Sequence, residues 1–311
     1  MRALRAFMLP GLAACLLAGA QGPARADEAT ASTLPAALPA IPTLPSSPRE
    51  DVLKLGYNVY VGGLNIFAFT IDVALNGETY AIKGSGESRG MARMFWRWST
   101  HLVAGGNVSA ERVRPQIYNV ETQSSRRDRS MQLSFDEGGK YTIRRTPVDT
   151  PHRAAKRDLP PVVPAGTVDP LTISLRIARD IVAGKGCKGT HPIFDGNRRY
   201  NLVFTDMGPS QVPFTPYSVY SGPAHRCQFD MVRISGFREP RDYIRFWDED
   251  SLDPPVLWIA PIVEGMPPVP VRAHGDLNMG GLRIYLVWAE HRGKPLFPGG
   301  TKPDIKFVRN R

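Results

Sequence analysis

The sequence predicts a mainly β protein, an antiparallel sheet that carries one α-helix, and three observations support this fold class. Short runs of alternating apolar and polar residues recur at intervals of about ten residues. Paired Gly and Asn-Gly sequences suited to tight turns separate several of these runs. One segment instead has apolar residues at helical spacing. This pattern is typical of a sandwich, a barrel or a spiral sheet with a helix over one face or mouth.

Residues 1–26 are predicted to be an export signal. Arg2 and Arg5 precede the apolar run 7–20, and Ala24-Arg25-Ala26 has the small-x-small form of a cleavage site. A membrane-spanning helix needs about 20 apolar residues, more than any run of this chain provides. We therefore expect cleavage after Ala26, no transmembrane span afterwards, and a location in the periplasm.

A lipoprotein signal is the alternative interpretation of this segment. Leu12-Ala13-Ala14-Cys15 has the Leu-small-small-Cys form that would make Cys15 the lipidated first residue. The apolar run continues past Cys15 and only a short stretch precedes it, which favours cleavage after Ala26. In both interpretations the protein leaves the cytoplasm.

Three further regions follow the signal. Residues 27–49 are rich in Pro, Ala, Ser and Thr without an apolar period, which predicts a disordered linker. Residues 50–290 are long enough for one β domain, and residues 291–311 form a polar tail that we expect to fray. The first strands of the domain are predicted at 53–60, 64–75, 80–83, 99–103, 116–122, 130–135 and 141–145. The predicted turns are Gly62-Gly63, Asn76-Gly77, Gly105-Gly106 and Gly138-Gly139.

A single helix interrupts the strands. Asp169 is predicted to cap it, with Pro170 at the first helical position and Gly184 at its end. Its apolar face is predicted to consist of Leu171, Leu175, Ala178 and Val182. Strands are predicted to resume at 200–204, 216–220, 226–234, 244–247, 256–259 and 282–288.

The chain is basic, with a formal net charge of +10 that falls to +7 when Arg2, Arg5 and Arg25 leave with the signal. In the cell envelope the available polyanions are lipid headgroups, lipopolysaccharide and wall polymers, so we expect an anionic envelope surface and no nucleic acid as partner. Solubility alone is the alternative explanation of the charge. The residues that would form a basic patch are Arg126, Arg127, Arg129, Arg144 and Arg145.

Two cysteines remain after cleavage, Cys187 and Cys227. A lone pair in an oxidising compartment predicts a disulfide, and closing a loop of about 40 residues would stabilise the fold by about 4 kcal/mol. Zinc is the alternative, because His191 and His225 beside these cysteines complete a two-sulfur, two-imidazole ligand set. Oxidation competes for the thiols, which favours the disulfide. We expect no cofactor and no metal.

Evidence for catalysis is limited to one motif. Gly86-Glu87-Ser88-Arg89-Gly90 matches the G-x-S-x-G pattern of a nucleophile elbow, which also requires a helix at the serine and a parallel sheet behind it. The surrounding pattern is antiparallel, so a strand-end turn is the favoured interpretation. Phe95, Trp96 and Trp98 follow Ser88 and either fill the core or line the lip of an apolar cavity.

Two motifs lie around the paired cysteines, D-G-N-R-R-Y-N-L at 195–202 and Y-S-G-P-A at 220–224. In this order they resemble the domain of unknown function 3108 family of exported bacterial proteins, over residues 53–290, with Cys187 and Cys227 in the positions that family uses. The chain is also similar to alphaproteobacterial cell-envelope-integrity proteins with a spiral, broken β-barrel and one disulfide, and more distantly to lipoprotein carriers. The resemblance implies a periplasmic, mostly β domain and supplies no activity.

We therefore expect a single antiparallel curved sheet that forms an open or spiral β-barrel with one α-helix packed on it. The expected function is a non-enzymatic cell-envelope protein that binds an apolar ligand, a lipid or lipoprotein acyl chain, or an envelope partner, and supports envelope integrity. A hydrolase that uses Ser88 and a purely structural scaffold with a filled barrel are the alternatives.

Overall fold

The computed structural model describes residues 51–109, 112–125, 127–149, 158–237, 253–277 and 280–305. The predicted export signal, Cys15, the predicted linker, Arg126, the predicted strand 244–247 and the last six residues lie outside these ranges.

The first half of the described chain consists of strands and one short helix. In order these are β1 (Val52–Val61), β2 (Leu64–Asn76), β3 (Thr79–Ser88), α1 (Gly90–Phe95), β4 (Trp98–Val108), β5 (Val113–Ser124), β6 (Arg129–Phe135) and β7 (Tyr141–Thr146). The second half begins with a longer helix and returns to strands. These elements are α3 (Thr172–Val182), β8 (Gly189–Phe194), β9 (Arg199–Val212), β10 (Gly222–Ser235), β11 (Val256–Ala260), β12 (Val269–Leu277), β13 (Gly280–His291) and β14 (Lys294–Pro295).

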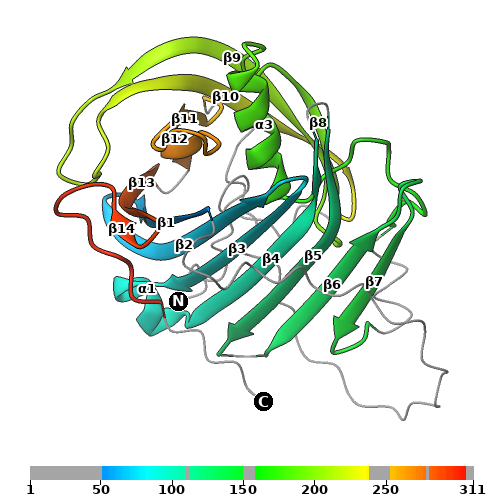
Figure 1. Ribbon diagram of the computed structural model, residues 1–311. Helices are drawn as coiled ribbons and strands as arrows, with labels where there is room; N and C mark the ends of the chain where they lie inside the picture. The colour runs from blue at the N-terminus through cyan, green and yellow to red at the C-terminus, as the bar shows by residue number, and fades with distance from the viewer. Residues whose placement is uncertain are drawn as a thin grey trace.

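All these strands belong to one sheet in the order β7-β6-β5-β4-β3-β2-β1-β13-β12-β11-β10-β9-β8, with β14 paired to β13. The last long strand, β13, pairs antiparallel with the first, so Leu53 lies opposite His291. The sheet curls around α3, which lies on its concave side (Figure 1). Its two edge strands, β7 and β8, are not hydrogen-bonded to each other. The predicted curved antiparallel sheet with an open barrel and a packed helix is confirmed.

Side chains and one backbone segment join the two edges. Residues 162–168 bridge them, with Val162 paired to Lys140 beside β7 and Val168 paired to Ile193 of β8. Phe194 at the end of β8 is fully buried, and its ring centroid lies 4.6 Å from that of Tyr141 in β7 and 6.4 Å from that of Phe135 in β6. The guanidinium of Arg145 donates a hydrogen bond to the carbonyl of Gly196 just beyond β8. Aromatic packing of this kind contributes about 1 kcal/mol per pair beyond the area it buries.

The D-G-N-R-R motif forms the tight turn at this junction. The carboxylate of Asp195 accepts the backbone N–H groups of Asn197 and Arg198 at 2.7 and 2.6 Å. Gly196 has φ +79°, and a Cβ at this position would lie 2.4 Å from the sulfur of Met131 in β6. Only glycine permits both the left-handed backbone and this close approach. The motif therefore docks the β8–β9 turn on the opposite edge of the sheet.

The predicted cap of the long helix is confirmed in its hydrogen bonds. The carboxylate of Asp169, which is fully buried, accepts the N–H groups of Leu171 and Thr172 at 2.9 and 3.0 Å and the hydroxyl of Thr172. That hydroxyl also shares a 2.7 Å hydrogen bond with the phenol of Tyr80 in β3. The cap therefore fixes the start of α3 to the sheet.

The predicted apolar face of this helix is wrong at one end. Leu171, Leu175 and Ala178 are buried, but Val182 is 71% exposed because the last turn extends beyond the sheet. Ile173 and Ile177 are buried as well. The helix therefore has two apolar faces, which suits an element enclosed by a curled sheet.

Other sequence predictions also need correction. Gly105 and Gly106 were predicted to form a turn but lie inside β4. The β4–β5 register shifts between them, which marks a β-bulge. A Cβ on Gly106 would lie 2.1 Å from the carbonyl oxygen of Arg114, so glycine is needed there. Residues 216–220 form a loop that crosses β13 through the Val219 N–H and the Leu286 carbonyl. Strands β8 and β12 and helix α1 were not predicted. In the described part of the tail, β14 pairs with β13 and Pro303 lies against Gly56.

The disulfide is present in the structure. Cys187 follows α3 and Cys227 lies in β10, and both are buried. The bond therefore ties the end of the helix to the strand that covers it.

We expect removal of this bond to weaken the fold measurably. The double variant Cys187→Ala/Cys227→Ala should lose about 4 kcal/mol of unfolding free energy, because the unfolded chain regains the entropy of a 40-residue loop. Urea denaturation of the oxidised wild type and of the variant measures the difference. Equal stability would show that this bond does not hold α3 to the sheet.

Asp169 should make stability depend on pH. Burial raises the pKa of its carboxyl to about 6, so between about pH 4 and pH 6 the folded state holds a proton that the unfolded chain has released. Unfolding free energy should therefore decrease as pH rises through this window, by roughly 3 kcal/mol at most. In Asp169→Asn an isosteric amide keeps the cap without titrating. Urea denaturation at pH 4 and pH 7 measures the unfolding free energy of both proteins. From pH 4 to pH 7 the wild type should lose stability relative to Asp169→Asn. A difference in unfolding free energy that is the same at both pH values would contradict the raised pKa of Asp169.

Candidate functional site

An apolar cavity lies between α3 and the concave face of the sheet. The helix, the Pro170 that precedes it and the four strands β9–β12 form its wall. The wall consists of Pro170, Ile173, Ser174, Ile177, Tyr200, Leu202, Phe204, Phe229, Leu257, Ile259 and Pro270. About 40 Å³ of it is open to the centres of water molecules. Small-molecule sites usually measure about 300 to 1,000 Å³, so this cavity is a narrow seam in the present structure.

Strand alternation and register assemble this wall. Successive side chains of a strand point to opposite faces, so Tyr200, Leu202 and Phe204 of β9 all point inward. Phe204 lies opposite Phe229 of β10, and their ring centroids are 5.6 Å apart. The hydroxyl of Ser174 donates to the carbonyl of Leu171 at 2.7 Å, so its hydrogen is already used within the helix. The seam is therefore largely a hydrocarbon surface.

A wider recess adjoins the seam at Ile259, which lines both. It has a volume of about 450 Å³ and is lined by Ile181, Pro209, Ser210, Gln211, Pro223, Ala224, His225, Ile259 and Pro261. Pro223 and Ala224 belong to the Y-S-G-P-A motif, whose Tyr220 hydroxyl donates to the Pro223 carbonyl. The volume is in the range of small-molecule sites. We call the recess and the seam together the α3 cleft.

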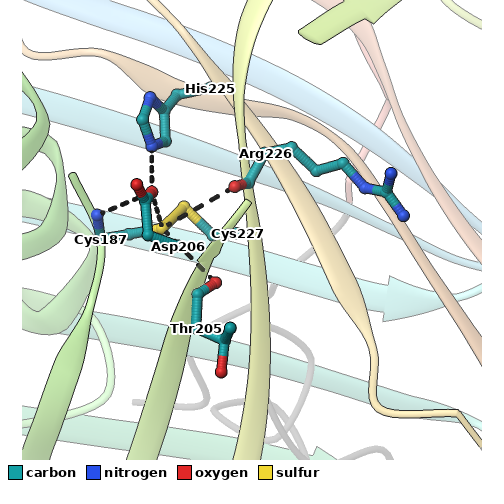
Figure 2. Close-up of a disulfide and its surroundings, with 6 residues drawn as sticks. All are labelled: Cys187, Thr205, Asp206, His225, Arg226 and Cys227. Atoms are coloured by element: carbon teal, nitrogen blue, oxygen red, sulfur yellow. Dashed lines mark hydrogen bonds and ion pairs between the residues drawn. A yellow bond between two sulfur atoms is a disulfide. The ribbon is translucent and has the colours of Figure 1, made fainter. Parts of the chain in front are cut away.

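The disulfide and two polar residues lie at the recess end of this cleft. Figure 2 shows the Asp206 carboxylate between the ring of His225 and the disulfide. The backbone N–H of Cys187 donates to the same carboxylate at 3.3 Å. Partial burial acts to raise the pKa of Asp206, but the hydrogen bonds from His225 and Cys187 outweigh it and hold that pKa below its ordinary value. The sequence carries no signal that would have identified Asp206.

The predicted zinc ligands do not assemble as a set. Cys187, Cys227 and His225 lie together with Asp206, with potential ligand atoms within 4.8 Å of one another. His191 is not in this group: it is buried in β8 with its ring 5.6 Å from that of Phe204, and burial lowers its pKa. Zinc binds thiolates, and the two sulfurs are bonded to each other here.

The aromatic residues predicted at a cavity lip lie elsewhere and in different environments. Trp98 is buried in β4, and Trp96 packs on it and on Phe67 with ring centroids 5.8 and 5.6 Å away. Phe95 ends α1 and is largely exposed. Phe95 and Trp96 lie in or directly after α1 and Trp98 begins β4, and none of the three lines the α3 cleft.

The described arginines of the predicted basic patch do not share one face. Arg144 and Arg145 are neighbours in β7, so they point to opposite sides of the sheet, and only Arg144 is exposed. Arg145 is within 3.4 Å of Asp149 and binds the Gly196 carbonyl. Arg127 and Arg129 are half-buried. Neighbouring position in the sequence did not produce convergence because a strand alternates its faces.

Ser88 has a structural environment. It is buried, and its Oγ accepts the Trp98 N–H at 3.2 Å. A six-residue helix does begin at Gly90, which was not expected, but the sheet behind it is antiparallel.

A serine–histidine pair was missed instead. Ser85 Oγ lies 3.0 Å from His101 Nδ1 across β3 and β4, and Glu121 lies opposite His101 in β5. Both β3 and β4 pair on both sides, so their N–H groups serve the ladders and provide no oxyanion site.

In the part of the chain that the structure describes, no helix has both the length and the apolar character needed to cross a membrane.

The state of the cysteines separates the disulfide from the zinc interpretation. Alkylation in denaturant should add no mass to the untreated protein and should modify Cys187 and Cys227 after reduction. The untreated protein should also bind no Zn²⁺, because neither sulfur is available as a thiolate. Two alkylated thiols together with bound zinc before reduction would contradict this assignment.

Comparison with known proteins gives a family and a structural likeness. A search of solved structures matched the crystal structure of a β-barrel-like protein of domain of unknown function DUF1849 from Brucella abortus. The identity is 12% and the TM-score 0.41, over 78% of this chain and 98% of that chain. The comparison with curated proteins found no match. The family model described as "Protein of unknown function (DUF3108)" matches residues 56–287. The chain therefore belongs to the DUF3108 family.

Proposed function

We propose that this protein is exported to the periplasm and binds an apolar chain, that of a lipid or of a lipoprotein, in the α3 cleft without catalysing a reaction. The observation that carries the proposal is the largely hydrocarbon wall that α3 and strands β9–β12 build, with a 450 Å³ recess at one end. Burial of each CH₂ group contributes about 0.8 kcal/mol, so even a short chain gains useful affinity from such a wall.

The narrow seam defines how a ligand enters. Its 40 Å³ is too small for an acyl chain, so a chain that extends from the recess into the seam must move Ile177 away from Leu257 and Ile259. The helix is anchored at its start by Asp169, Thr172 and Tyr80, and beyond its end by the disulfide. Between these anchors the seam-lining residues Ile173 and Ile177 meet the strands through apolar packing. The middle of α3 is therefore the part that yields.

Three observations support the envelope location. Residues 1–26 have the form of an export signal, and a disulfide persists in oxidising compartments. The positive net charge suits a compartment bounded by anionic lipids. A protein that holds acyl chains there would support envelope integrity by keeping lipid out of water.

Two neighbouring residues of α3 provide the test. Ile181 lines the recess, while Val182 points away from the protein and is 71% exposed. In Ile181→Trp the indole should occupy the recess and weaken binding of a fluorescent fatty acid at least about tenfold, equivalent to 1.4 kcal/mol. Val182→Trp adds the same ring outside the cleft and should bind as wild type does. A fluorescence titration of all three proteins measures the dissociation constants.

Two results would contradict the proposal. The first is wild type that shows no saturable binding of the fatty acid after lipid has been removed. The second is wild-type affinity in both tryptophan variants, which would place the fatty acid outside the α3 cleft. Thermal unfolding of each variant verifies that the added ring has not disrupted the fold.

A further inference from the structure

Helix α1 carries large apolar side chains that the rest of the protein leaves in solvent. Met91, Met94 and Phe95 are 58%, 81% and 72% exposed. Leu64, at the start of β2 beside which α1 lies, is 53% exposed. Single exposed apolar residues are common, but several large ones on one short element indicate an interaction site.

Arginines recur on the same segment at every fourth residue. Arg89, Arg93 and Arg97 alternate with the apolar positions, and residues 88–98 contain no acidic residue. The carboxylate of Glu87 lies within 3.2 Å of Arg89 and 3.6 Å of Arg93. Asp304 also lies here, since its carbonyl accepts a hydrogen bond from the Arg89 guanidinium. Two acidic residues against three arginines leave this segment with a small local excess of positive charge.

The two kinds of side chain occupy different sides of the helix. At 3.6 residues per turn, Arg89 and Arg93 lie on one side, and Met91, Met94 and Phe95 on the other. Trp96, directly after α1, packs edge-on against Phe67 and so fastens the helix to β2. The result is an amphipathic helix fixed where β3 ends and β4 begins.

We propose that α1 docks the protein on an anionic lipid bilayer, with Met91, Met94 and Phe95 inserted at the boundary between headgroups and acyl chains. Charge complementarity selects this occupant: Arg97 lies just after α1, Arg93 lies on the other side of the helix, and both are exposed, so the segment presents positive charge to anionic lipid phosphates. A methionine-rich apolar surface without this basic flank would fit a protein partner as well. This docking proposal depends on the proposed function in one respect only, the location of the protein in the envelope.

Docking through α1 leaves the α3 cleft accessible. α1 lies where β3 ends and β2 begins, whereas the recess lies where β9 ends and β10 begins. In the antiparallel order β2-β1-β13-β12-β11-β10-β9 these are opposite ends of the strands. Figure 1 shows α1 at the rim of the sheet, away from α3. A protein seated on a membrane through α1 would therefore hold the mouth of its cleft away from that membrane.

Vesicle flotation tests the docking surface. Exported wild-type protein, with its N-terminus determined by mass spectrometry, should float with vesicles of phosphatidylethanolamine and phosphatidylglycerol. It should bind vesicles of phosphatidylethanolamine and phosphatidylcholine at least tenfold less, and high salt should release it. Met94→Ser/Phe95→Ser should reduce the partition coefficient more than about tenfold. Arg97→Gln should reduce it about fivefold through loss of one charge.

Phe214→Ser is the matched control, because Phe214 is 80% exposed in the β9–β10 loop at the far end of the strands. It should float as wild type does, and all variants should keep the wild-type thermal midpoint and fatty-acid affinity. If wild type does not bind anionic vesicles but does bind the fatty acid, the docking proposal is wrong and the proposal for the α3 cleft is unaffected. Equal loss in Phe214→Ser, or no loss in Met94→Ser/Phe95→Ser, would also overturn it.

Discussion

Phe194 lies where the two edges of the curled sheet meet, and the rest of the fold depends on that contact. Strands β7 and β8 do not share a ladder, so the two edges are joined by Phe194 against Tyr141, by Arg145 on the Gly196 carbonyl, and by the backbone of residues 162–168, which bridges to both edges. Sheet twist brings the edges near each other, but twist alone does not fix the distance between them. The D-G-N-R-R turn sets that distance, because Gly196 admits Met131 where any Cβ would collide. The glycine and the aspartate of this motif therefore have structural roles, Gly196 in the close approach to Met131 and Asp195 in the turn.

A curl of this width has a concave face that one layer of side chains does not fill. Helix α3 covers it, with Leu175 and Ala178 on one apolar face and Ile173 and Ile177 on the other. The second face packs against β9–β12 less tightly than the first face packs against its strands, and the gap that remains is the seam with its recess. Buried Asp169 at the start and the disulfide after the end restrict how far the helix can shift. The same pair of anchors that stabilises the fold therefore leaves the middle of α3 free to yield.

Local signals in the sequence predicted the elements that obey local rules. Asp169-Pro170 predicted the helix start because a cap needs only its own next three residues, and Asn76-Gly77 predicted a hairpin for the same reason. Features set by distant partners were misjudged. Gly105 and Gly106 resemble a turn but serve a bulge against Arg114, and Val182 continues the apolar spacing of a helix that the sheet no longer covers. The spacing of Ile173, Ile177 and Ile181 was a usable signal for the second face. Asp206 had none, since it meets His225 only through the β9–β10 pairing.

Native mass spectrometry of the exported protein, purified gently without detergent, tests the central claim most directly. The account predicts a population that carries a mass in the range of a lipid or acyl chain, lost on denaturation, from a protein whose Cys187–Cys227 bond is intact. A uniformly empty protein, which also fails to take up added lipid, would contradict it. The curled sheet around α3 would then be a filled structural scaffold.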